Sequence, residues 1–180
     1  MRFERLVDDG RLWSVIYDGD SANAFNQVFS QWNDFEWLTS FFKENADDLN
    51  HYFHITDVDA AIYDTVEEAN NLECLILDLS SDISLDRLFR PLNNLDPPDS
   101  FLSKEKAKGR NPIHASWLRI YAIRIQSGVY IVTGGAIKLT ATMKERAHTI
   151  KELEKMNKVR DFLVEIGISD LDDFELYNNG

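Results

Sequence analysis

Four side chains in the second half of the chain carry the functional groups that phosphate chemistry on RNA requires. They are Arg119, Tyr121, Lys138 and His148. Cleavage of RNA needs a base that activates a 2′-hydroxyl, cations that stabilise the dianionic phosphorane, and an acid for the leaving oxygen. We treat the four as candidate catalytic residues. Arg119 and Lys138 would contact phosphate, and Tyr121 and His148 would serve in base stacking or proton transfer.

A further set of cations is suited to binding backbone phosphates. Arg124 shares a predicted strand with Arg119, and four lysines lie on one face of a predicted helix, spaced with His148 by four, three, four and three residues. The alternative for each lysine is the solvated face of an amphipathic helix. The candidate nucleic-acid contacts are Arg124, Lys144, Lys151, Lys155 and Lys158.

Charge is strongly segregated along the 180 residues, whose net charge is −12. Residues 104–160 hold 13 Lys or Arg and four Glu, which gives +9. Residues 1–103 carry −15, and residues 161–180 carry −6. Such asymmetry is informative about binding partners rather than about the fold, and it indicates a function for the basic block as a whole.

Familiar catalytic and cofactor motifs are absent from the sequence, including GxxxxGK[ST], GxSxG, HExxH and GxGxxG. His51 and His54 lie three residues apart near acidic side chains, which leaves a metal-dependent enzyme as a further alternative, but they lack a third patterned ligand. We expect no metal and no cofactor. The single cysteine, Cys74, excludes an internal disulfide, and its apolar neighbours predict that it is buried.

The candidate residues must be positioned by a strand hairpin. The sequence predicts a strand over 116–125, a turn at Ser127-Gly128 and a returning strand from 129. A two-residue turn places Tyr121 opposite Gly134 and Arg119 opposite Ala136, with both side chains on one face. The double glycine at 134–135 indicates a bulge or a close backbone approach.

The rest of the chain predicts an N-terminal hairpin followed by helices. The hairpin covers 3–7 and 11–17, and helical periodicity runs over 21–32, 34–42 and 57–78. Thr142 and Glu145 have the spacing of a capping box, so we expect one long helix over 143–166. Lys104–Arg110 is expected to be an exposed basic stretch.

Together these elements predict a single α+β domain over 1–180. An antiparallel sheet, formed largely by 117–139, packs beside an N-terminal helical portion and a long C-terminal helix. Residues 1–100 form an acidic hairpin-plus-helices portion, and residues 101–180 a basic β-hairpin and long helix. The first ten residues have no apolar core of a signal peptide, and no apolar stretch approaches the ~20 residues of a membrane helix, so we expect a cytoplasmic protein without a membrane partner.

The run from Trp117 to Thr140 and the basic helix after it, within 117–160, resemble the distal half of RelE/HigB-like toxins of the RelE/ParE superfamily. The shared features are a strand bearing Arg, a hairpin return ending near Lys, and a following helix with basic residues. The resemblance implies a small sheet flanked by helices in a bacterial toxin–antitoxin protein. It also implies action on RNA or the ribosome, as a metal-independent mRNA endoribonuclease or a related inhibitor, and neutralisation by a small antitoxin protein.

The alternative is a non-catalytic protein-interaction module with an acidic surface, whose acidic portion folds against, or recruits a partner to, the basic face. The net charge of −12 favours this alternative, because it repels nucleic acid at long range. The discriminating observation is whether the cations are open to solvent or covered by the carboxylates of residues 1–103.

Overall fold

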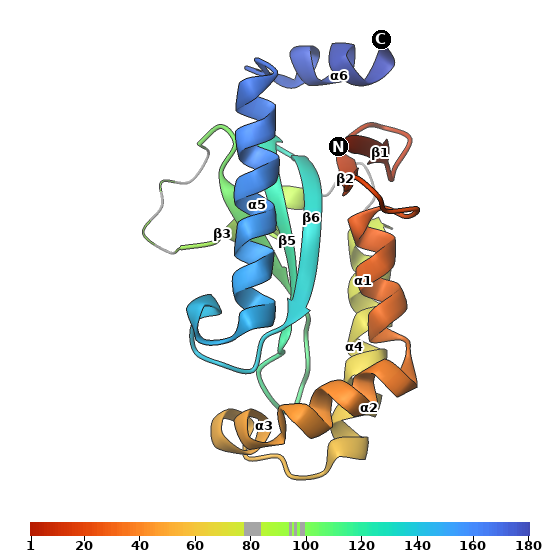
Figure 1. Cartoon of the computed structure of the whole chain (residues 1–180), viewed down its shortest axis with the longest axis vertical. Helices are drawn as coiled ribbons and strands as arrows, with labels where there is room; N and C mark the ends of the chain where they lie inside the picture. The colour runs from red at the N-terminus through yellow and green to blue at the C-terminus, as the bar shows by residue number, and fades with distance from the viewer. Residues whose placement is uncertain (78–83, 94, 96, 98–99) are drawn as a thin grey trace.

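The computed structural model describes residues 1–77, 84–93, 95, 97 and 100–180, and in this part of the chain a six-stranded sheet lies between helices on both faces (Figure 1). β2 pairs with β6 in parallel, and the other neighbouring strands are antiparallel. The expected mixed α and β class with an antiparallel hairpin is therefore confirmed. In sheet order the strands are β1 (Arg2–Arg5), β2 (Leu12–Ile16), β6 (Val129–Ile137), β5 (Leu118–Gln126), β4 (Lys104–Lys108) and β3 (Arg90–Pro91).

The helices form two layers. In Figure 1, α1 and α4 lie to the right of the sheet and α5 runs along its other face at the left. The described helices are α1 (Ala24–Trp32), α2 (Phe35–Glu44), α3 (Ala46–Phe53), α4 (Val58–Leu77), α5 (Ala147–Glu165) and α6 (Leu171–Asn179), with single 3₁₀ turns η1 (Leu85–Arg87) and η2 (Met143–Glu145).

Alternate residues of β5 pack into two separate hydrophobic cores. Ile120 and Ala122 belong to the core under α1, α2 and α4, whereas Tyr121 and Ile123 belong to the core under α5. This alternation follows from the pleat of a strand. It places Arg119 with Tyr121 on the face that α5 covers.

The predicted pairing of the central hairpin is confirmed at the two positions that matter for the site. Arg119 pairs with Ala136 and Tyr121 with Gly134. The register shifts by one residue near the turn and shifts back between Tyr121 and Ala122. Two opposite bulges therefore restore the simple register before it reaches Arg119.

The double glycine at 134–135 lies beside the bulge and also lets neighbouring groups approach the β6 backbone closely. A Cβ on Gly134 would lie 2.0 Å from Glu152 Oε2 of α5, and one on Gly135 would lie 2.8 Å from the Arg119 carbonyl oxygen. Gly135 also faces Val28 of α1, at 2.9 Å. Both helix layers thus approach the sheet where β6 has no side chains.

The prediction of one helix over 143–166 is wrong in its first turn. Thr142 and Glu145 do interact, through a bond from the Thr142 N–H to Glu145 Oε1 of 2.6 Å, but they close only η2. Arg146 is extended (φ −137°, ψ 144°), and its guanidinium binds Asp48 of α3. α5 therefore starts at Ala147, and α6 follows it near the C-terminus.

Three further expectations need correction. The Lys104–Arg110 stretch is not a free basic segment, because Lys104–Lys108 forms β4 and pairs along β5. The N-terminal portion has an additional helix, α3, between the predicted ones, and Cys74 is exposed on α4 rather than buried. Asp78, the predicted end of α4, lies outside the described residues.

Candidate anion-binding site

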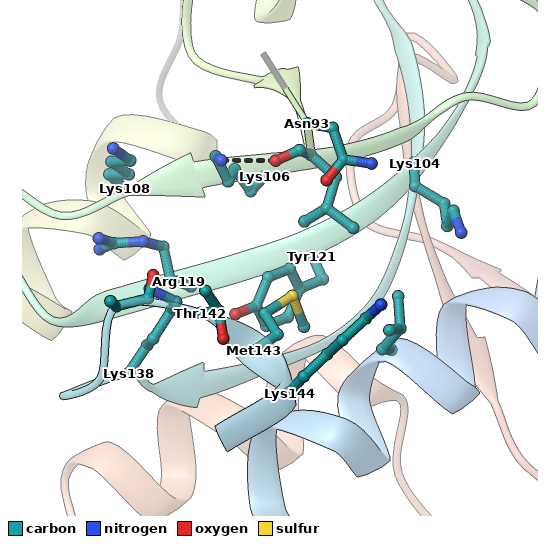
Figure 2. Close-up of a pocket in the computed structure, with 13 residues that line it drawn as sticks. Asn93, Lys104, Lys106, Lys108, Arg119, Tyr121, Lys138, Thr142, Met143 and Lys144 are labelled. Atoms are coloured by element: carbon teal, nitrogen blue, oxygen red, sulfur yellow. Dashed lines mark hydrogen bonds between the residues drawn. The ribbon is translucent and has the colours of Figure 1, made fainter. Parts of the chain in front are cut away.

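A pocket of about 640 Å³ opens between the outer strands of the sheet and the segment that links β6 to α5. Six cationic side chains line it, and no carboxylate belongs to its lining. Figure 2 shows the labelled cations around the central Tyr121. The six cations are Lys104, Lys106 and Lys108 of β4, Arg119 of β5, Lys138 just after β6, and Lys144 of η2. We call this the basic pocket.

β4 supplies half of the cations because its lysines alternate. Lys104, Lys106 and Lys108 share the face that α5 covers, and the intervening Glu105 and Ala107 are buried toward the other layer. Alternate strand residues are about 6.8 Å apart, so the three lysines leave the strand at evenly spaced backbone positions.

Neutral acceptors hold four of the six cations in place. The Arg119 guanidinium donates to the carbonyls of Ser116 and Leu118, at 2.7 and 2.8 Å. Lys138 Nζ donates to the carbonyls of Thr140 and Ala141, both at 2.7 Å. Lys106 Nζ donates to the Leu92 carbonyl at 2.7 Å, and Lys104 Nζ to Asn157 Oδ1 at 3.0 Å.

No ion pair within the described ranges of the chain involves the six cations of the basic pocket, although Glu145 acts on Lys138 and Glu68 on Arg119 at longer range. The ion pairs found there join other cations, such as Arg146 with Asp48 and Lys155 with Glu152. Burial and the neighbouring cations Lys108 and Arg119 lower the pKa of Lys106. Burial, followed by the charges of Arg119 and Lys106, likewise lowers the pKa of Lys138. Both lysines therefore release a proton more readily than a solvated lysine, and an anion in the pocket would reverse this effect.

Tyr121 lies at the floor of the basic pocket. Its side chain is buried, and its hydroxyl has no hydrogen-bond partner among the described residues. Burial raises the pKa of the phenol above its ordinary value, an effect that Arg119 partly opposes. The hydroxyl therefore keeps its proton and is suited to donating a hydrogen bond to an anion. The buried ring does not offer a face for base stacking.

The candidate catalytic residues are only partly brought together. Arg119, Tyr121 and Lys138 line the basic pocket, but His148 does not. The His148 Nε2 lies 2.9 Å from the Ile137 carbonyl oxygen, and its ring packs edge-on against Phe41 of α2. These contacts tie the start of α5 to the sheet and to α2.

Arg124 faces away from the basic pocket. It is five residues from Arg119 on the same strand, so the two side chains leave opposite faces of the sheet. Arg124 is buried, and its Nε lies 3.5 Å from Asp86 Oδ1. Asp86 also accepts bonds from Ser127, Gly128 and Tyr130, so this arginine belongs to a network that holds the β5–β6 turn.

The predicted basic stripe is divided by the break at Arg146. Lys144, on η2, lines the basic pocket, whereas Lys151, Lys155 and Lys158 project from α5 outside its lining. Lys155 Nζ binds Glu152 at 2.7 Å and lies over the Tyr17 ring, near which Lys158 also lies. Lys151 and Lys158 are exposed.

The β4 lysines are the functional candidates that sequence reasoning missed. Their signal is present as Lys-Glu-Lys-Ala-Lys, in which Lys recurs at every second position, the period of a strand. The high charge of the segment is typical of an exposed loop, whereas its period of two is typical of a strand.

The described residues contain no group of three or more His, Cys, Asp or Glu side chains arranged to hold a metal ion. His51 lies exposed on α3, and His54 ends that helix in a left-handed conformation. No helix in the described ranges is both long and apolar enough to cross a membrane.

Comparison of the chain with protein-family models, with curated proteins and with solved structures gives no match. The function is therefore inferred from the chemistry of the basic pocket.

Proposed function

We propose that this protein binds RNA through the basic pocket and acts on RNA or the ribosome as the toxin of a bacterial toxin–antitoxin module. The observation that carries the proposal is the convergence of six cations from β4, β5, the segment after β6 and η2 without a carboxylate in the lining. Such a site has a net attraction for phosphate, because charges held by neutral acceptors are available to an anion.

RNA accounts for the number and layout of the cations better than a single small anion does. A lone phosphate is satisfied by two or three of the six cations, which come from four structural segments. Lys104, Lys106 and Lys108 alternate along one strand, so their long side chains can reach successive phosphates of an extended single strand. Arg119, Lys138 and Lys144 fall within 117–160, where the sequence resembles RelE/HigB-like toxins.

The pocket also contains the groups that RNA cleavage requires. In the proposed reaction the 2′-oxygen attacks the adjacent phosphorus and the bond to the 5′-oxygen breaks, which leaves a 2′,3′-cyclic phosphate and a 5′-hydroxyl. Lys106 and Lys138 serve as the base and the acid of this reaction. The lysine that is a neutral amine accepts the proton of the 2′-hydroxyl, and the lysine that is a charged ammonium protonates the leaving 5′-oxygen. Arg119 stabilises the phosphorane, and Tyr121 donates a hydrogen bond to it.

The alternative, a non-catalytic interaction module, places carboxylates of the acidic portion over the cations. Within the described residues such pairs join Asp48 with Arg146 and Asp86 with Arg124, outside the pocket lining, and none involves the six pocket cations. This pattern favours RNA over an internal acidic partner.

Binding of a fluorescent single-stranded RNA oligonucleotide, followed by anisotropy, tests the proposal. Lys138→Ala should weaken binding about tenfold, because it removes one charge-assisted phosphate contact. Lys151→Ala is the matched control, since it removes an exposed lysine outside the pocket, and should bind as the parent does. Equal affinities for the parent and both variants would contradict the proposal.

Toxicity and cleavage are tested separately from binding. Induced expression should arrest growth, Arg119→Ala combined with Lys138→Ala should relieve the arrest, and Lys151→Ala should not. Incubation with RNA and ribosomes should yield cyclic-phosphate ends, which a 2′-deoxy substitution at the cleaved position abolishes. Binding without growth arrest or cleavage would instead support the non-catalytic module.

A further inference from the structure

We infer that the basic pocket contains a subsite for one unstacked nucleobase, formed by the apolar side chains that lie between its two groups of cations. This inference rests on the proposed function, because it takes the pocket to be a nucleic-acid site. It adds to that function a reason to bind a nucleotide rather than phosphate alone.

Three apolar side chains meet in the pocket from three different segments. Leu92 follows β3, Met143 belongs to η2 and Leu153 to α5, and all three line the pocket. Each is partly buried and packs against the core cluster that contains Tyr121. Figure 2 shows Met143 directly beside Tyr121 in the centre of the pocket. The result is an apolar surface, open to the pocket, inside a site that otherwise carries charge.

The cations lie on two sides of this apolar surface. Lys108, Arg119 and Lys138 lie together on one side in Figure 2, and Lys104 and Lys144 lie on the other. A nucleotide inside an RNA strand has the same order of groups, because its nucleoside is flanked by a 5′ and a 3′ phosphate. The chemical class that fits is therefore a nucleoside with phosphate on both sides.

A flat heterocycle gains from this surface in two ways. Its faces are apolar, so burying them against Leu92 and Leu153 is favourable, and the thioether of Met143 adapts to an aromatic partner. The hydroxyl of Tyr121 is buried at the floor and lacks a partner among the described residues, and we assign it as a donor to a phosphate or ribose oxygen. Stacking on the Tyr121 ring is not required.

Calorimetric titration with two probes tests the subsite: adenosine 3′,5′-bisphosphate and the matching ribose 3,5-bisphosphate without a base. The nucleotide should bind about tenfold more tightly than the abasic probe. Met143→Ala should lose most of this preference and leave the affinity for the abasic probe unchanged. Met143→Leu should restore the preference, because it returns an apolar side chain of similar volume.

Leu176→Ala is the matched control, since Leu176 is an exposed leucine on α6, far from the pocket lining, and it should change neither affinity. Equal affinity of the two probes for the parent protein would overturn the subsite and leave phosphate binding intact. Loss of both affinities in Lys138→Ala, with the preference retained in Met143→Ala, would also overturn it. If neither probe nor RNA binds, the proposed function fails together with the subsite.

Discussion

At the scale of single residues, the hydroxyl of Tyr121 is the feature that best separates a structural role from a binding role. A buried hydroxyl without a hydrogen-bond partner costs stability, because it has lost its water without replacement. Tyr121 is such a group among the described residues, and it lies under a cluster of cations. A phenol that serves packing alone would be equally well replaced by phenylalanine.

We predict that Tyr121→Phe leaves the free energy of unfolding unchanged or raises it by up to about 1 kcal/mol, since it removes only the unsatisfied hydroxyl. The same variant should bind single-stranded RNA about three- to tenfold more weakly, because the bound phosphate loses a donor. Urea denaturation and anisotropy measure the two effects. Unchanged affinity would show that the hydroxyl does not touch the ligand.

Some of the residue positions were predictable from the sequence, and others were not. Arg119 and Tyr121 share a face and have the expected partners, although only because two bulges cancel. The opposite direction of Arg124 follows from the same alternation and could have been predicted. The position of His148 could not, because it depends on where α5 begins and on its contact with Phe41 of α2.

At the scale of elements, the pocket depends on features that local sequence signals describe only partly. The capping box at 142–145 is real, but tertiary contacts of Arg146 with α3 extend the backbone at the next residue and end the turn. The segment Lys104–Lys108 is polar enough to resemble a loop, yet pairing with β5 makes it a strand. In both places long-range contacts override local propensity.

The double glycine of β6 is the element-scale feature that admits a direct test. We predict that Gly135→Ala lowers the free energy of unfolding by about 1–3 kcal/mol, because its Cβ would meet the main-chain oxygen of Arg119. Gly134→Ala should cost less, since the atom it meets ends the Glu152 side chain and can rotate away. Urea denaturation of both variants measures the order.

The Glu152→Ala background supplies the control for that order. Removing this carboxylate should relieve the cost of Gly134→Ala by at least about 0.5 kcal/mol and leave the cost of Gly135→Ala unchanged. The reverse pattern would mean that β6 does not approach the two helix layers as described.

At the scale of the whole molecule, the proposed function requires a polyanion to approach a basic pocket on a chain whose net charge is −12. Screening by salt decides how the attraction of RNA to the pocket cations balances its repulsion by the acidic remainder of the molecule. At about 0.15 M salt the Debye length is about 8 Å, so RNA in the pocket interacts mainly with the pocket's own cations. At about 0.01 M it is about 30 Å, and the acidic remainder of the molecule contributes repulsion.

We therefore predict a salt dependence with two regimes. Between about 0.1 and 0.3 M salt, the logarithm of the affinity should fall with the logarithm of the salt concentration with a slope of about −3 to −4, if most of the six cations contact phosphate of a single strand. Below about 0.03 M the slope should flatten, because the acidic surface then acts on the parts of the RNA outside the pocket.

RNA length and one pocket variant supply the controls. The slope for a tetranucleotide, which extends little beyond the pocket, should flatten less than the slope for a 20-mer, and Lys138→Ala should reduce the steep slope by about 0.7. A slope that stays equally steep at low salt for both lengths would show that the acidic portion does not act on bound RNA, and a slope near zero throughout would show that phosphate is not what the pocket binds.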